Sequence, residues 1–219
     1  MSDATVVSTL EAQIEQFKRA GAARTAPAII ALRKVETEKL IQTGIAEQSF
    51  HKGDRAPDFT LPDANGRSVT LSSLLKTGPV VFTFYRGEWC PYCNLTLRAY
   101  QAVLPQIKAL GATLVAVSPQ RPDFSQAMIT KADLTFPVLS DVGNHVARQY
   151  RLVFTLPGPL RPYSANLPRF NDDDSWELPV PGTFVIGQDG VIHAAFVHAD
   201  YTKRMEPAAI LSALTEMHQ

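Results

Sequence analysis

The two cysteines of the chain, Cys90 and Cys93, lie three residues apart in the string FYRGEWCPYC, directly after Trp89. At this spacing one thiol can attack a substrate and the other can then close a disulfide with it. A structural zinc site needs about four ligands, but the chain has no second cysteine pair and its five histidines lack ligand-like spacing. Two inert buried cysteines are the other alternative. The pattern favours a redox-active pair with no metal and no organic cofactor, because thiols carry the electrons themselves.

The elements around the cysteines are those that activate a thiol. The apolar run PVVFTFY over 79–85 predicts a buried strand. Pro91 suits the first position of a helix, and apolar residues recur at helical spacing over 91–110. This places Cys90 at the helix N-cap and Cys93 in the first turn. There, unpaired backbone N–H groups and the helix dipole favour the thiolate and lower its pKa.

Strands and helices alternate through the rest of the chain. Two short strands are expected around the Asn65-Gly66 turn. The further predicted elements are a strand over 112–118, a helix over 123–132, a strand end at 136–141, a helix over 142–150, a hairpin over 183–197 and a helix over 207–217. The order predicts an α/β sheet covered by helices on both faces.

Two segments stand apart from this pattern. Residues 1–50 show helical periodicity and are predicted to form an N-terminal extension to a domain over 51–219. The extension packs on its own domain or forms a homodimer contact, and both readings stay open. The proline-rich insertion over 151–178 has no clear periodicity, which is typical of a functional or mobile loop.

Bulk composition excludes several classes of partner. The chain has 219 residues, 45% of them hydrophobic, and its 21 basic residues equal its 21 acidic residues. No basic excess points to nucleic acid or an anionic membrane, and no apolar stretch approaches the roughly 20 residues that span a bilayer. The N-terminal sequence lacks the features of a secretory signal. We therefore expect a cytoplasmic protein, in a compartment where close cysteine pairs are more often metal-binding or redox-active than structural.

Three strings resemble the thioredoxin-fold superfamily, and within it the peroxiredoxin-like proteins of the alkyl hydroperoxide reductase and thiol-specific antioxidant family. They are GDRAPDFTLPDANGRSVTLSSL at 53–74, FYRGEWCPYC at 84–93 and LPVPGTFVIGQDGVI at 178–192. The resemblance runs from Gly53 to the C-terminus. It implies a thioredoxin-like fold, with a central mixed sheet flanked by helices, in which Pro181 takes the place of the thioredoxin cis-proline.

The active-site sequence is intermediate between those of peroxiredoxins and thioredoxins. Aligned with peroxiredoxins, Cys93 takes the peroxidatic position, Cys90 the threonine position and Arg86 the proline position of their motif. The arginine that peroxiredoxins place before the TF strand is Pro181 here. The buried acid that thioredoxins often carry six residues before the first cysteine is Phe84 here.

The resemblance therefore implies two enzymatic activities that share residues. In a thiol-dependent peroxidase acting on hydrogen peroxide or organic hydroperoxides, Cys93, or alternatively Cys90, becomes a sulfenic acid and is captured as a Cys90–Cys93 disulfide. A dithiol reductant such as thioredoxin, glutaredoxin or glutathione then restores the thiols. In a thiol–disulfide oxidoreductase, an exposed Cys90 attacks protein or small-molecule disulfides beside Pro181. A third alternative is a non-catalytic redox-sensing module.

Peroxide reduction also needs donors that stabilise charge on the departing oxygen. A guanidinium from Arg86, Arg161, Arg169 or Arg204 can supply them, and of these only Arg86 lies near the cysteines in sequence. For the three distant arginines we expect a solvated surface position.

Four neighbours of the cysteines are candidates for active-site support. Trp89 directly precedes the first cysteine, as in the thioredoxin string. Glu88 is a candidate proton relay, with an exposed loop carboxylate as the alternative. Tyr85 and Tyr92 are candidates for a pocket wall, with ordinary packing as the alternative.

Overall fold

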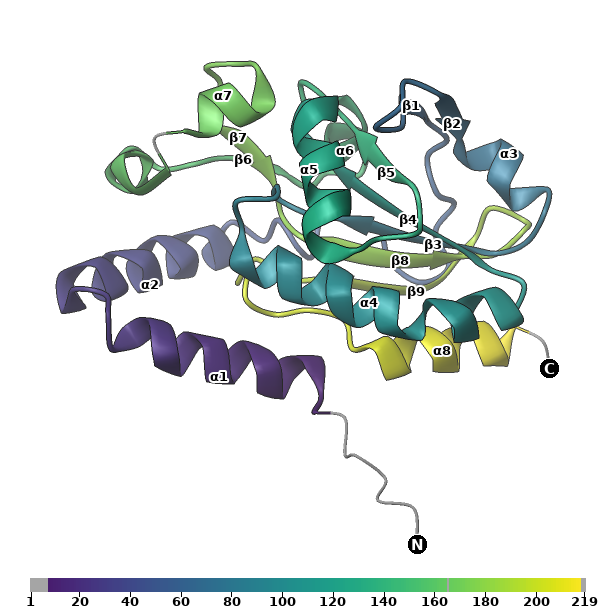
Figure 1. The fold of residues 1–219 in the computed structure, drawn as a ribbon, viewed down its shortest axis with the longest axis horizontal. Coiled ribbons are helices and arrows are strands. Elements are labelled where there is room, and N and C mark those ends of the chain that lie inside the picture. The colour runs from purple at the N-terminus through teal and green to yellow at the C-terminus, as the bar shows by residue number, and fades with distance from the viewer. Residues whose placement is uncertain (1–7, 165, 218–219) are drawn as a thin grey trace, which may run out of the picture.

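A mixed five-stranded sheet forms the centre of the protein in the computed structural model, which describes residues 8–164 and 166–217 (Figure 1). Its strands are β3 (Val80–Phe84), β4 (Thr113–Ser118), β5 (Val138–Ser140), β8 (Gly182–Ile186) and β9 (Ile192–Val197), in the order β5-β4-β3-β8-β9. Strand β3 runs parallel to β4 and antiparallel to β8. The predicted fold class, a central mixed sheet flanked by helices, is confirmed.

Helices cover both faces of this sheet because successive strand residues point to opposite sides. On one face Val81, Leu114 and Val185 pack with three helices, and on the other Phe82 and Val115 pack with two helices and a hairpin. The first set is α4 (Pro91–Ala109), α5 (Pro122–Ala132) and α8 (Pro207–Glu216). The second set is α3 (Leu71–Leu75), α6 (His145–Gln149) and the hairpin of β1 (Thr60–Pro62) and β2 (Ser68–Thr70).

Two helices precede the sheet, α1 (Leu10–Ala22) and α2 (Pro27–Gln42). Helix α1 lies beside α4 (Figure 1) and buries Leu10 and Ile14 in the same core cluster as both cysteines. The Glu206 carboxylate accepts hydrogen bonds from the backbone N–H groups of Leu10 and Glu11, at 3.1 and 2.7 Å. An acceptor at this end of a helix satisfies donors that have no partner within the helix.

The proline-rich segment over 151–178 contains regular structure that its sequence did not indicate. Strands β6 (Val153–Thr155) and β7 (Glu177–Pro179) pair in antiparallel fashion. Between them lie a 3₁₀ helix, η1 (Gly158–Ser164), and α7 (Leu167–Asn171). Strands of three residues are too short to show a period. Among the described residues, no helix is long and apolar enough to cross a membrane.

Candidate active site

The strand-to-helix junction places both cysteines at the N-terminus of α4. Cys90 is the N-cap, with φ −89° and ψ 109°, and Pro91 is the first helical residue, as predicted. Cys93 therefore lies in the first turn. Both are free thiols, and both are buried, with exposed fractions of 1% for Cys90 and 0% for Cys93.

Hydrogen-bond donors and positive charge surround the Cys93 sulfur. The backbone N–H of Arg86 donates to Sγ at 3.5 Å, and Nη2 of Arg204 donates at 3.7 Å. Burial by itself raises the pKa of Cys93. The hydrogen bond from the Cys90 thiol, the Arg204 guanidinium and the Arg86 N–H together outweigh burial, so that the pKa of Cys93 lies well below its usual range. Cys93 is therefore the thiolate of the pair.

The Cys90 thiol has the opposite character. Burial raises its pKa well above the usual range, and the hydrogen bond and charge of Cys93 raise it further. Cys90 thus keeps its proton while Cys93 is ionised. The two sulfurs lie in the same buried site, where Cys93 is the nucleophile and Cys90 is its protonated neighbour.

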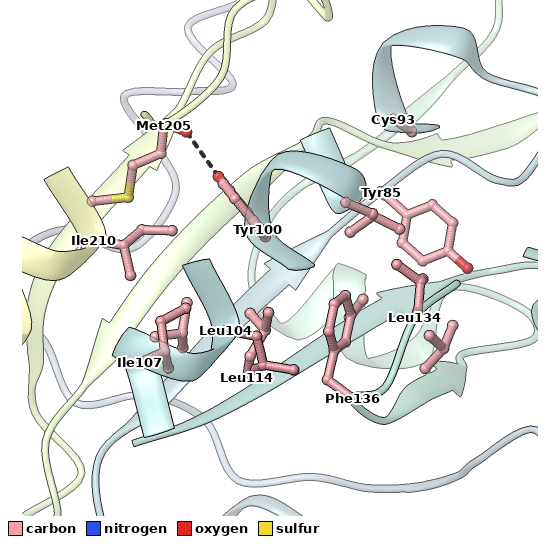
Figure 2. Packing of buried hydrophobic residues seen from close by; sticks show 14 of the residues in the cluster. Tyr85, Cys93, Tyr100, Leu104, Ile107, Leu114, Leu134, Phe136, Met205 and Ile210 are labelled. Atoms are coloured by element: carbon pink, nitrogen blue, oxygen red, sulfur yellow. Dashed lines mark hydrogen bonds between the residues drawn. The ribbon is translucent and has the colours of Figure 1, made fainter. Parts of the chain in front are cut away.

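The expectation of a solvated surface position is wrong for Arg204. Its Nη1 donates to the Tyr201 carbonyl and, at 2.8 Å, to the Lys203 carbonyl, which leaves Nη2 directed at Cys93. The sequence separation of 111 residues hid this contact. The loop between β9 and α8 is joined to the middle of α4, where the Tyr100 hydroxyl donates to the Met205 carbonyl at 2.9 Å (Figure 2).

The other two distant arginines lie away from the thiols. Arg161 donates to the Leu156 carbonyl at 3.2 Å and lies over the Trp176 ring. Arg169 lies over the Phe124 ring.

Arg86 is held between two aromatic rings. Its guanidinium carbon lies 4.8 Å from the centre of the Trp89 ring and 4.5 Å from that of Tyr201. The side chain is 6% exposed, and its Nε has no hydrogen-bond partner among the described residues. An unpaired buried donor is costly, and this nitrogen is left unsatisfied beside the thiols. Trp89 thus touches the site through Arg86.

Gln120 organises the loop that leads into Cys90, and the sequence analysis did not find it. Its Oε1 accepts from the Glu88 N–H at 2.8 Å, and its Nε2 donates to the Tyr85 hydroxyl at 2.9 Å. Gly87 has φ 145°, and a Cβ there would lie 2.5 Å from Nε1 of Trp89. A glycine is therefore required at this point of the loop.

The remaining candidates lie near the thiols but take different positions. The Glu88 carboxylate pairs with Nζ of Lys131 at 3.2 Å and so is held by a lysine. Tyr85 lies in the core beside α4 (Figure 2), where burial raises its pKa. Tyr92 is half-buried and packs edge-on against Tyr201.

The expectation of a cis peptide bond at Pro181 is wrong, since no peptide bond among the described residues is cis. Pro181 is buried between β7 and β8. The preceding Val180 N–H donates to the Leu152 carbonyl at 2.8 Å.

The site carries no cluster of metal ligands. Within residues 8–164 and 166–217, no group of three or more His, Cys, Asp and Glu side chains could hold a metal ion. The arrangement instead offers a stabilised thiolate, a neighbouring thiol and two arginines. This constellation can attack an electrophilic atom and then form a disulfide.

The sheet topology and the thiol pair at a helix N-terminus define a thioredoxin-fold protein. A sequence profile described as AhpC/TSA family matches residues 52–195, and the chain belongs to this family. The N-terminal helices and Arg204 lie outside the matched range.

Comparisons with individual proteins agree with this assignment. The chain is 32% identical over 139 residues to chloroplastic peroxiredoxin Q of Triticum aestivum, covering 62% of this chain and 64% of the relative. It is 30% identical over 153 residues to chloroplastic peroxiredoxin Q of Arabidopsis thaliana, covering 70% of this chain and 62% of the relative. The chain thus spans less than two thirds of the length of these curated relatives.

Solved structures share the fold. Peroxidoxin BcpB from Mycobacterium tuberculosis superposes with a TM-score of 0.63 at 23% identity, covering 78% of this chain and 99% of that one. A PrxQ mutant from Xylella fastidiosa superposes with a TM-score of 0.62 at 18% identity, covering 78% of this chain and 98% of that one.

Proposed function

We propose that the protein is a thiol-dependent peroxidase in which Cys93 is the attacking thiolate. The observation that carries this proposal is the pair of contacts to the Cys93 sulfur from Arg86 N–H and Arg204 Nη2. They stabilise negative charge on the sulfur in a buried site, where such charge is otherwise costly. Family membership and the peroxiredoxin Q relatives support the same activity.

In the first step the Cys93 thiolate attacks one oxygen of the peroxide. A sulfur–oxygen bond forms and the oxygen–oxygen bond breaks, so the sulfur is oxidised to a sulfenic acid and the peroxide is reduced. The departing oxygen takes a proton and leaves as water or an alcohol. The guanidinium groups of Arg86 and Arg204 stabilise the negative charge that passes from the sulfur to that oxygen.

In the second step Cys90 resolves the sulfenic acid. Its sulfur bonds to that of Cys93, and the sulfenic oxygen leaves as water, which gives a Cys90–Cys93 disulfide. A dithiol reductant such as thioredoxin, glutaredoxin or glutathione returns the pair to two thiols. Cys90 needs no low pKa of its own until this step.

The disulfide-exchange alternative requires an exposed and nucleophilic Cys90. Both thiols are buried, but the pKa of Cys90 is raised while that of Cys93 is lowered, which argues against Cys90 as the leading nucleophile. The division at residue 50, a cytoplasmic location and a homodimer remain predictions from the sequence.

The test is peroxide consumption by the purified protein with dithiothreitol as the reductant. We expect turnover in the wild type, and no turnover above the background of free reductant in Cys93→Ser. Consumption that is equal in the wild type and in Cys93→Ser would overturn the proposal. Turnover of a mixed disulfide, with none of peroxide, would instead support the oxidoreductase reading.

A further inference from the structure

A cavity of about 300 Å³ lies beside the thiol site, between α2 and the segment over 154–160. Its wall is largely apolar. The apolar side chains that line it include Leu40, Phe154, Leu156, Pro157 and Leu160. Helix α2 lies outside the residues that match the family profile. One wall of this cavity is therefore formed by a part of the chain that the profile does not include.

The cavity adjoins the thiol site through Arg86, and neither cysteine lines it. Arg86 and Tyr201 both line it, and the backbone N–H of the same Arg86 donates to Cys93 Sγ. Arg86 is 6% exposed and its Nε has no partner among the described residues. Because Arg86 lines the cavity, a ligand there lies against a buried cationic residue whose backbone N–H holds the reactive sulfur.

The cavity wall also carries a compensated charge. Glu36 lines the cavity and is 8% exposed, and its Oε1 pairs with Nζ of Lys39 at 2.7 Å. Because Glu36 and Lys39 pair with each other, neither offers a free charge to the apolar part of a ligand. The ligand that fits has a neutral apolar body and a polar group that lies against Arg86.

We propose that this cavity binds the apolar body of a neutral organic hydroperoxide and directs its peroxide group past Arg86 towards Cys93. Hydrogen peroxide has no apolar surface to bury, so the cavity contributes nothing to its binding. The inference rests on the proposed peroxidase activity and adds the part of the molecule that selects the substrate. Helix α2 and the 154–160 segment supply the selecting walls.

The test compares Leu40→Trp, which fills the cavity, with Val35→Trp on the same helix. Val35 is 46% exposed and does not line the cavity. The readout is the ratio of kcat/KM for cumene hydroperoxide to kcat/KM for hydrogen peroxide. We expect Leu40→Trp to lower this ratio about tenfold, since an apolar pocket discriminates by about 10–200-fold per small group, and Val35→Trp to leave it unchanged. An unchanged ratio in Leu40→Trp, or an equal fall in both variants, would overturn the inference.

A binding measurement separates this inference from the peroxidase proposal. Cumyl alcohol has the same apolar body as cumene hydroperoxide and no peroxide bond, and its binding can be followed by calorimetric titration. If the wild type consumes neither peroxide, the peroxidase proposal fails. Cumyl alcohol binding that is weakened by Leu40→Trp and kept in Val35→Trp would then still support a cavity for apolar ligands. No binding to the wild type would refute the cavity as well.

Discussion

The local environment gives two cysteines three residues apart opposite protonation states. Cys93 is surrounded by the Cys90 thiol, Arg204 and the Arg86 N–H, which lower its pKa despite burial. Burial and the neighbouring charge of Cys93 raise the pKa of Cys90. The division of roles between nucleophile and resolving thiol follows from these contacts.

The lowered pKa predicts how Cys93 reactivity depends on pH. In Cys90→Ser, where the serine hydroxyl can still donate to Cys93, alkylation by iodoacetamide should be near its maximum at pH 7. The rate should fall only as the pH drops through the lowered pKa, because protonation removes the thiolate. A rate that keeps rising up to pH 9, the ordinary pKa of this group, would contradict the assignment.

Removing the Arg204 charge should raise the pKa of Cys93. In Cys90→Ser, adding Arg204→Gln should move the midpoint of the alkylation profile to higher pH. For a rise of one pKa unit from about 5, alkylation should slow about twofold at pH 6 and about tenfold at pH 4, where both variants are mostly protonated. Arg169→Gln, on an arginine that lies over Phe124, is the matched control and should leave the profile unchanged. Equal profiles for the two variants would show that Arg204 does not act on the thiolate.

The sequence identified the residues whose roles are local. The spacing of Cys90 and Cys93 and the proline between them predicted the N-cap geometry correctly, since a helix start is determined by a few neighbouring residues. Arg204 and Gln120 reach the site only through the tertiary fold. Nothing in the strings around them marks them, so their roles became visible in the structure alone.

At the scale of elements, Tyr100 connects α4 to the segment that carries Arg204. Its hydroxyl donates to the Met205 carbonyl at 2.9 Å (Figure 2). The same hydroxyl lies 3.1 Å from Oγ1 of Thr183. One buried side chain thus joins the helix of the thiols, a central strand and the loop before α8. Met205 directly follows Arg204 in the chain, so this connection holds the backbone next to the guanidinium.

Tyr100→Phe should therefore affect both stability and reactivity. The variant leaves the buried Met205 carbonyl without this donor, which we expect to cost about 1–3 kcal/mol in the free energy of unfolding. The midpoint for Cys93 alkylation should also rise, because the Arg204 segment loosens. Urea denaturation and the pH profile measure the two effects, with Tyr163→Phe, at 49% exposure, as the control. Loss of stability with an unchanged midpoint would show that Tyr100 does not position Arg204.

Sequence periodicity predicted the elements that are long or fully buried. The strands of the central sheet and helices α4, α5 and α8 were expected close to their observed bounds. The short pair β6 and β7 was missed because its residues are far apart in sequence and pair only in the folded chain. The trans bond at Pro181 depends on how β7 leads into β8, which a motif does not reveal.

At the scale of the whole molecule, the N-terminal helices are part of the site's surroundings. Ile14 of α1 belongs to the core cluster that holds both cysteines, and Glu206 accepts from the start of the same helix. Helix α2 forms a wall of the cavity beside Arg86. The family resemblance predicted the central fold and left these contacts unassigned, because they lie outside the motifs.

A charge at Ile14 should detach α1 from the rest of the protein. Ile14 is 3% exposed, so Ile14→Asp buries an unpaired carboxylate, which is costly unless the helix moves away. We expect rapid proteolytic cleavage within residues 10–26 and a lower free energy of unfolding. Ile30→Asp, at a position 40% exposed on α2, should behave like the wild type. Equal protease resistance in both variants would contradict the docking of α1.

The most direct test of the account is mass spectrometry of sulfenic acid formation in Cys90→Ser and Cys93→Ser, mixed rapidly with equimolar hydrogen peroxide. We expect the variant that keeps Cys93 to oxidise far faster than a free thiol and the variant that keeps Cys90 to oxidise slowly. Faster oxidation of Cys90 would reverse the roles assigned to the two thiols. If neither cysteine is oxidised faster than a free thiol, the protein is not a peroxidase of the kind proposed.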